Sequence, residues 1–396
     1  MRVVIEAPRP IRRHALLCAF VAFAVTSCKP DTLTKPEPGA LLPTEAWRIA
    51  APGGQGTDIS TVPVPFGASL LALSPRGKLV SINQATGALV WSAARGAGDA
   101  LPRRLLVADD RVLWAGDSVN GLDLATGARV WTYAPAFTTA GCDPSVAGDL
   151  FIVCTRDWNV VALRARTGET VWIRPLRDSL RGVPSLVATA VSGDTVYAVV
   201  KQDYSQSLGF SAAIVFVLSR QTGAILTTIQ EGNYTDFTGD MTTPTVVGNL
   251  LILSHILVNR LTAVDRFTKQ GVWRVNGESG WAGFQLYGPL SVRDGIIYAA
   301  SADRRVYAIA SLTGTLRWKS QVLEGSQTAA VVCGPLVATW SSVNVRILSR
   351  ATGAFLGQIN TGPTSAYNIQ TRPVVDGAAL FLESAAEFRR LDCGDG

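Results

Sequence analysis

Histidine and methionine are nearly absent from this chain, which holds two of each in 396 residues. His14 lies near the N-terminus, so His255 is the only histidine in the rest of the chain. A metal site built from several histidines, or a catalytic triad that depends on one, therefore has almost no material here. Charged residues make up only 17% of the chain. Surface helices are usually dense in Glu and Lys, so this composition favours a fold of strands and turns.

The N-terminal segment has the pattern of a secretory signal. Residues 1–27 carry four arginines, followed by an apolar run over residues 15–25. Such a run is too short to cross a membrane as a helix and is typical of a signal peptide. The run leads into Val25-Thr26-Ser27-Cys28, which resembles a bacterial lipobox. In such signals the cysteine is acylated and becomes the new N-terminus, which predicts lipidation at Cys28; the alternative is a plain signal peptide with a chance cysteine.

Residues 28–44 are predicted to form a lipidated tether. Residues 29–39 include three prolines in eleven positions, which favours an extended chain. Lys29, rather than an aspartate, follows the lipobox cysteine, and by resemblance to Gram-negative sorting rules this favours the outer membrane. Removal of residues 1–27 takes away four of the 36 basic and one of the 30 acidic residues, leaving a net charge of about +3. No Lys/Arg cluster remains that would indicate nucleic-acid binding.

Residues 45–396 are built from one repeated unit. A Thr-Gly pair followed four residues after the Gly by Trp occurs at Gly87 and Trp91, Gly127 and Trp131, Gly168 and Trp172, and Gly314 and Trp318. In degenerate copies Thr227 replaces the Trp, Lys269 replaces the Gly before Trp273, and Gly357 stands in a Trp position. The seven copies have a mean spacing of about 44 residues, the period of a four-stranded propeller blade.

The interior of each repeat reads as short strands joined by tight turns. In the sixth repeat, β-branched and aromatic runs at residues 288–292, 296–300 and 305–310 flank an Asp294-Gly295 turn. The C-terminus supplies three such strands without a fourth, whereas residues 45–50 supply a Trp-led strand without a preceding three. Pairing them protects the edge strands and joins the chain ends. We therefore predict an all-β fold, an eight-bladed propeller of four-stranded antiparallel blades closed by the N-terminal strand joining the C-terminal blade.

These repeats resemble the PQQ-like, tryptophan-docking β-propellers over essentially all of residues 46–396. In that family the Trp packs between neighbouring blades against the Gly-containing turn. The resemblance therefore implies a structural docking role for Gly87, Trp91, Gly127, Trp131, Gly168, Trp172, Trp273, Gly314 and Trp318. Together with the lipobox and tether, the ring also resembles the propeller lipoproteins of the outer-membrane β-barrel assembly machinery.

The same family contains quinoprotein dehydrogenases, which offer an enzymatic alternative. The resemblance implies that such enzymes need PQQ on the ring axis, a Ca²⁺ held by carboxylates and amides, and a catalytic Asp. Many also carry a disulfide between adjacent cysteines. This sequence has no adjacent cysteines, lacks large insertions, and shows no Asp/Asn/Glu cluster with the spacing of a cation-binding loop. We therefore expect neither PQQ nor Ca²⁺ as a cofactor, and no catalytic or metal-binding residue is predicted.

Four cysteines of the repeats are candidates for disulfides in an oxidising compartment. Cys142 and Cys154 flank the turn at Gly148-Asp149 at matching distances, so strands paired across that turn would bring them together. The alternative is two buried free thiols. Cys333 and Cys393 fall at turns on one face of neighbouring blades, where a second bridge could form. No C-x-x-C spacing exists that would suggest a metal site.

Long loops around blades four to six hold most of the unexplained aromatic residues. They cover residues 201–210, 231–237 and 277–287 and lie on one face of the predicted ring. Their aromatic residues are Tyr204, Phe210, Tyr234, Phe237, Trp281, Phe284 and Tyr287. Aromatic side chains separated by glycines suggest a partner-binding patch; the alternative is that the rings plug the funnel of the propeller. His255 is expected to be a hydrogen-bonded strand histidine rather than a ligand.

The sequence thus predicts a non-catalytic propeller scaffold for protein–protein interaction in the cell envelope. It would be lipid-anchored to the periplasmic face of the outer membrane and would bind protein partners, not nucleic acid. Assembly of outer-membrane β-barrels is the leading specific role, by resemblance. The alternatives are a quinoprotein-like dehydrogenase and a periplasmic sensor propeller that binds a small ligand or a glycan.

Overall fold

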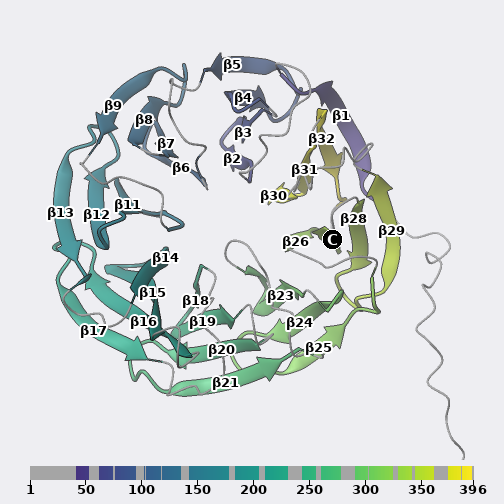
Figure 1. The fold of residues 1–396 in the computed structure, drawn as a ribbon. Coiled ribbons are helices and arrows are strands. Elements are labelled where there is room, and N and C mark those ends of the chain that lie inside the picture. The colour runs from purple at the N-terminus through teal and green to yellow at the C-terminus, as the bar shows by residue number, and fades with distance from the viewer. Residues whose placement is uncertain are drawn as a thin grey trace, which may run out of the picture. The chain divides into compact units, whose positions relative to one another are not determined.

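The regular secondary structure of the residues that the structure describes consists of strands arranged as the blades of a ring (Figure 1). The computed structural model describes residues 42–52, 62–74, 76–94, 102, 104–116, 118–134, 142–177, 183–204, 210–230, 243–255, 260–277, 290–301, 303–323, 329–340, 344–360, 373–384 and 386–394. Within them, 32 strands form eight antiparallel sheets of four. The predicted eight-bladed propeller is confirmed.

The first half of the ring contains blades 1 to 4. Blade 1 consists of β2 (Val64–Phe66), β3 (Ser69–Leu73), β4 (Leu79–Asn83) and β5 (Leu89–Ala93). Blade 2 consists of β6 (Leu105–Ala108), β7 (Arg111–Ala115), β8 (Val119–Asp123) and β9 (Arg129–Tyr133). Blade 3 consists of β10 (Ser145–Ala147), β11 (Leu150–Cys154), β12 (Asn159–Arg164) and β13 (Thr170–Pro175). Blade 4 consists of β14 (Val183–Ser192), β15 (Thr195–Tyr204), β16 (Phe210–Ser219) and β17 (Ile225–Gln230).

The second half contains blades 5 to 8. Blade 5 consists of β18 (Thr245–Val247), β19 (Leu250–His255), β20 (Arg260–Asp265) and β21 (Gly271–Asn276). Blade 6 consists of β22 (Ser291–Arg293), β23 (Ile296–Ala300), β24 (Val306–Ala310) and β25 (Leu316–Lys319). Blade 7 consists of β26 (Ala330–Cys333), β27 (Leu336–Trp340), β28 (Asn344–Ser349) and β29 (Phe355–Asn360). Blade 8 consists of β30 (Val374–Asp376), β31 (Ala379–Glu383), β32 (Glu387–Asp392) and β1 (Thr44–Ala50).

The antiparallel strand order defines two faces of the ring. In each blade the first strand lies toward the centre and the fourth lies at the periphery (Figure 1). The connections between the first and second strands and between the third and fourth strands lie on one face, called here the turn face. The connections between the second and third strands, and from each fourth strand to the next blade, lie on the opposite face, called here the loop face.

The N-terminal strand closes the ring, as predicted. β1 pairs antiparallel with β32, with Thr44 opposite Asp392 and Ala50 opposite Glu387. The two ends of the propeller therefore share one sheet, and blade 8 has no unpaired third strand that could associate with another chain. Because both ends are held in the ladder, neither can fray without breaking backbone hydrogen bonds of the same blade.

The hydrophobic core lies between the blades. Alternate residues of a strand point to opposite sides of its sheet. In β3, Leu70 packs in a cluster with Phe381 of blade 8, whereas the next residue, Leu71, packs in a cluster with Val112 of blade 2. Each blade therefore contributes apolar side chains to both of its neighbours, and the stability of the ring depends on how well adjacent blades fit.

Candidate functional site

Tryptophans of the outer strands link six of the eight blades to the next blade. The indole Nε1 of Trp172 in β13 donates a hydrogen bond to the carbonyl oxygen of Arg220 in blade 4, at 2.7 Å. The Trp172 ring covers Gly223 in the same turn, where an added Cβ would lie 2.5 Å from a ring atom. Trp47, Trp91, Trp131, Trp273 and Trp318 donate in the same way, at 2.8 to 3.0 Å, to the carbonyl oxygens of Gln84, Leu124, Ala165, Ser311 and Arg350. Each Trp thus docks on the turn of the following blade.

Two separate requirements select glycine in the docking turn. Gly127 has a φ of +73°, in the left-handed region that other residues rarely adopt. A Cβ at Gly127 would also lie 2.6 Å from the ring of Trp91, which is too close for any side chain. The glycines that meet a Trp in this way are Gly87, Gly127, Gly168, Gly223, Gly314 and Gly353.

The docking site also includes a small residue opposite the Trp, which was not predicted from the sequence. The residue opposite each docked Trp of blades 1, 2, 3, 5 and 6 on the neighbouring third strand is small. These residues are Ser81, Gly121, Ala162, Ala263 and Ala308. A Cβ at Gly121 would overlap the ring of Trp131. The signal was present, because each of these residues precedes its Trp by ten positions.

Two degenerate repeats turn out to be one modified interface. Thr227 of blade 4 stands where the Trp would be, and Lys269, at a φ of +65°, occupies the glycine position of the facing turn in blade 5. A side chain on that turn would fill the place of an indole ring, so the loss of Gly and the loss of Trp belong together. Arg266 supplies a different link, donating hydrogen bonds to Tyr197 Oη at 3.0 Å and to the carbonyl oxygen of Gly248 at 3.1 Å.

This pairing predicts that the two substitutions depend on each other. The test uses a Val217→Ala background, which makes room opposite position 227. In that background, Thr227→Trp alone should destabilise the propeller, because the new indole meets the side chain of Lys269. Adding Lys269→Gly should recover stability, with a favourable coupling of about 1 kcal/mol or more in a double-mutant cycle. Urea unfolding of the four proteins measures the coupling. Additive effects of the two substitutions would show that these residues do not meet.

The remaining degenerate repeat lies where the ring is closed. Gly357 of β29 stands in the Trp position of blade 7, but blade 8 has no continuous turn between β32 and β1 on which an indole could dock. Leu42, just before β1, packs there instead, with its Cδ2 2.9 Å from where a Cβ of residue 357 would lie. The segment that enters β1 therefore replaces the missing Trp.

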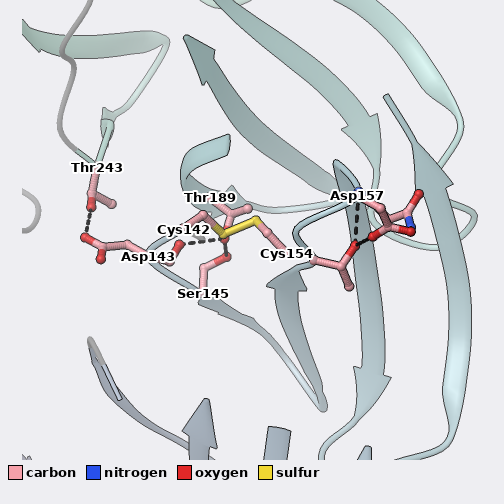
Figure 2. Close-up of a disulfide and its surroundings, with 9 residues drawn as sticks. Cys142, Asp143, Ser145, Cys154, Asp157, Thr189 and Thr243 are labelled. Carbon is pink, nitrogen blue, oxygen red and sulfur yellow. Dashed lines mark hydrogen bonds between the residues drawn. A yellow bond between two sulfur atoms is a disulfide. The ribbon is translucent and has the colours of Figure 1, made fainter. Parts of the chain in front are cut away.

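All four candidate cysteines form disulfides in the structure. Cys142 and Cys154 are joined across the hairpin of β10 and β11 (Figure 2). Cys333, at the end of β26, is joined to Cys393, which follows β32. The first bridge therefore lies within blade 3. The second links blade 7 to blade 8 on the turn face and holds the C-terminal segment there.

Asp143, next to the disulfide between Cys142 and Cys154, connects blades 3, 4 and 5. The backbone N–H of Thr189 in blade 4 donates to the carbonyl oxygen of Asp143 at 2.9 Å. Thr243, just before blade 5, donates from Oγ1 to Asp143 Oδ2 at 2.7 Å (Figure 2). Ser145 and Thr189 hydroxyls lie 2.8 Å apart. This polar cluster joins Asp143, just before β10, and Thr243, just before β18, to Thr189 within β14.

The predicted partner-binding residues are only partly within the described chain. Tyr204 ends β15 and Phe210 begins β16, and the two are paired in register. The predicted loop over residues 201–210 is therefore wrong in part, since residues 201–204 and 210 extend a hairpin of ten-residue strands. The β-branched and aromatic partner strand β16 favours this longer pairing. Tyr234, Phe237, Trp281, Phe284 and Tyr287, as well as Cys28, lie outside the described residues.

The described part of the chain shows few side chains that could bind a metal ion or act as a catalytic acid or base. No three His, Cys, Asp or Glu side chains gather there as a metal site. No helix found within the same residues has the length and apolarity needed to cross a bilayer. His255 is buried in β19, with its Nε2 3.5 Å from Thr262 Oγ1.

Glu383 is the most unusual titratable group of the ring. Its side chain is buried at the end of β31, and neither carboxylate oxygen has a hydrogen-bond partner within the described structure. Burial raises the pKa of this carboxyl well above its ordinary value, because desolvation penalises the charged form. The stability contributed by the neutral carboxyl is therefore complete below the ordinary glutamate pKa and is lost as pH rises toward the folded-state pKa.

Glu383→Gln should therefore stabilise the protein in a pH-dependent way. The free energy of unfolding should rise near pH 8 and change little near pH 4, because the unfolded-state glutamate is charged at the higher pH and folding must then neutralise it or bury its charge. Thermal unfolding at both pH values measures the difference. Glu169→Gln, on an exposed turn of blade 3, is the control and should have little effect at either pH. Equal stabilisation by Glu383→Gln at both pH values would contradict the assignment.

Comparison with known proteins agrees with the architecture. The profile of the family described as outer membrane protein assembly factor BamB matches residues 43–275 and 211–387. The outer membrane protein assembly factor BamB of Bordetella pertussis is 24% identical over 352 residues, covering 84% of this chain and 83% of the relative. BamB from Moraxella catarrhalis has a TM-score of 0.66 at 20% identity, covering 89% and 98% of the two chains. The predicted resemblance to PQQ-like propellers is confirmed.

An enzyme with the same fold is also similar in structure. Quinohemoprotein alcohol dehydrogenase from Comamonas testosteroni has a TM-score of 0.64 at 14% identity, covering 89% of this chain and 76% of the enzyme. At such low identity the likeness shows a common fold and carries no information on activity. The choice between scaffold and enzyme therefore depends on the residues of this chain.

Proposed function

Because the chain belongs to the family of outer membrane protein assembly factor BamB, we propose that it is a non-catalytic scaffold in outer-membrane protein assembly. The observation that carries the proposal is the family match across the ring, from residue 43 to residue 387. We further propose that acylation of Cys28 anchors the protein to the periplasmic face of the outer membrane. The lipobox and the proline-containing tether support the anchor.

The rigid ring supports a role in presenting binding surfaces. Its blades are connected by docked tryptophans, by the disulfide between Cys333 and Cys393 and by the shared sheet of blade 8. The strand ends held in such a framework keep their relative positions, which lowers the ordering cost of presenting a binding surface to a partner. The aromatic residues of the loops around blades 4 to 6 are the proposed partner-binding patch.

The described residues fit a quinone cofactor with calcium poorly. The docking tryptophans lie in the outer strands, with their indole N–H groups bonded to carbonyl oxygens of the next blade, so they are not placed to stack on a ligand at the axis. The acidic side chains of the described chain do not gather in a group of three. The two disulfides join cysteines 12 and 60 residues apart, not neighbours. These features support a scaffold over a quinoprotein dehydrogenase.

A crosslinking pull-down from native membranes tests the scaffold. The wild-type protein should recover a core component of the barrel-assembly machinery. Trp281→Ser combined with Phe284→Ser should reduce that recovery roughly ten-fold, because buried aromatic residues provide much of the energy of protein interfaces. Ile173→Ser, an exposed outer-strand residue, is the matched control. Unchanged recovery by the double variant would contradict the aromatic patch, and no recovery by the wild type would contradict the assembly role.

A further inference from the structure

A belt of exposed apolar side chains lies at the rim of the turn face. In blades 1 to 5 the strand register skips one residue of the outer strand, immediately before the docking position. The skipped residues are Val90, Val130, Val171, Leu226 and Val272, and all five are exposed. Since each outer strand leaves the turn face only a few residues earlier, this belt lies close to that face.

Two adjacent turns extend the apolar surface beyond the belt. Phe267 and Leu312 occupy equivalent positions at the tips of the turns in blades 5 and 6, and their exposed fractions are 62% and 65%. The corresponding residues of the other continuous turns are small, polar or charged, namely Ala85, Ala125, Arg166, Gln221 and Ala351. The Arg266 guanidinium lies 4.5 Å from the centre of the Phe267 ring. An aromatic ring with a cation over it is suited to a boundary between water and apolar material.

The charges around these two tips favour an anionic surface. Arg266, Lys269, Arg293 and Arg317 are basic, whereas the nearby acids are Asp265 and Asp294. Asp265 already accepts hydrogen bonds from the backbone N–H groups of Phe267 and Thr268, at 2.9 and 2.8 Å. Asp294 is paired with Arg350 of blade 7 and also lies 3.9 Å from Arg293. With Arg350 included, the sector holds five basic and two acidic side chains, so it keeps a net positive charge that would attract an anionic partner.

The chain enters the ring on this same face. Thr44 pairs with Asp392, at the end of the third strand of blade 8, so Leu42 precedes β1 on the side of the turns. Leu42 lies fourteen positions after Cys28, which allows a reach of at most about 50 Å. An acyl chain on Cys28 would therefore hold the turn face within reach of a bilayer.

We propose that the turn face of blades 5 and 6 docks on the phospholipid surface that holds the anchor. Phe267 and Leu312 insert at the headgroup level, and the surrounding basic side chains face anionic headgroups. This inference rests on the proposed lipid anchor for its orientation, while the apolar tips and their charge come from the ring itself. Its consequence is that the loop face, with the proposed partner-binding patch, points away from the membrane.

Site-specific labelling tests the orientation. The acylated mature chain, which begins at Cys28, has no free thiol, because Cys28 carries lipid and the other four cysteines form disulfides. An environment-sensitive fluorophore on Leu312→Cys should be quenched by brominated lipids in vesicles of phosphatidylethanolamine and phosphatidylglycerol. The same label on Arg156→Cys, an exposed loop-face position, should not be quenched. Equal exposure of both labels to water would overturn the proposal.

Vesicle binding without the anchor provides the second measurement. The mature chain from residue 28 onward, carrying Cys28→Ser, should bind these vesicles, and adding Phe267→Ser and Leu312→Ser should weaken binding on the order of ten-fold. Ile173→Ser should bind as before. No binding by the Cys28→Ser chain, or loss of self-association rather than of vesicle binding in the Ser variants, would overturn the proposal. The Phe267→Ser and Leu312→Ser chain should still recover its protein partner, which separates this inference from the scaffold role.

Discussion

Replacing Trp172 with alanine is expected to lower the free energy of unfolding by about 3 to 5 kcal/mol. The ring of Trp172 is buried between blades 3 and 4, and its indole N–H is bonded to the carbonyl oxygen of Arg220. The substitution removes a large apolar contact and leaves a cavity over Gly223, a residue that cannot fill it. The same change leaves that carbonyl without its donor, which adds to the loss.

Thr227→Ala provides the matched control for this prediction. Thr227 stands in the same position of the next blade but has no indole to lose, so its replacement should cost less than about 1 kcal/mol. Urea unfolding followed by far-UV circular dichroism measures both values. Equal losses in the two variants would mean that the docking position contributes no more at the interface of blades 3 and 4 than at that of blades 4 and 5.

Replacing Cys333 and Cys393 together with serine is expected to cost about 4 kcal/mol. The bridge closes a segment of 60 residues and ties the C-terminal segment to blade 7. Without it the unfolded chain gains the entropy of an open loop, while the folded ring loses a covalent link at the junction where the two chain ends meet. The Cys142 and Cys154 pair, separated by 12 residues, should contribute less, about 3 kcal/mol.

Reduction shows whether the stability lost in these serine variants comes from the disulfide bonds or only from altered packing of the cysteine side chains. Dithiothreitol should lower the stability of the wild type, and the protein lacking both bridges should not respond to it. Thiol counting on the unfolded, unreduced chain should find none of these four cysteines free. Four free thiols, or a stability that does not depend on the reductant, would contradict the bonded pairs.

Much of the fold was predictable because the motif of one blade recurs along the sequence. The spacing of about 44 residues, with Trp four residues after Gly, indicated the blade, and the unmatched ends indicated the closed ring. The degenerate copies were less informative in sequence. Thr227 and Lys269 are 42 positions apart and belong to different repeats, so their dependence became visible only when blades 4 and 5 were placed side by side.

The candidate site was less predictable than the fold. A long segment between two strands reads as a loop unless its partner is known, which is why the continuation of β15 to Tyr204 was missed. Glu383 gave no sequence signal, because a glutamate at the end of an apolar strand is usually exposed, whereas its burial is decided by neighbouring residues.

The sequence by itself determined the blade, the number of repeats and the closure, since these depend on local periodicity and on short-range turn chemistry. Only the tertiary structure decided which blade receives each tryptophan, why Gly357 needs none, and that Phe267 and Leu312 project from the same face at which the chain enters. These facts concern residues from different blades. Their relation follows from the way eight sheets pack around one ring, which no single repeat encodes.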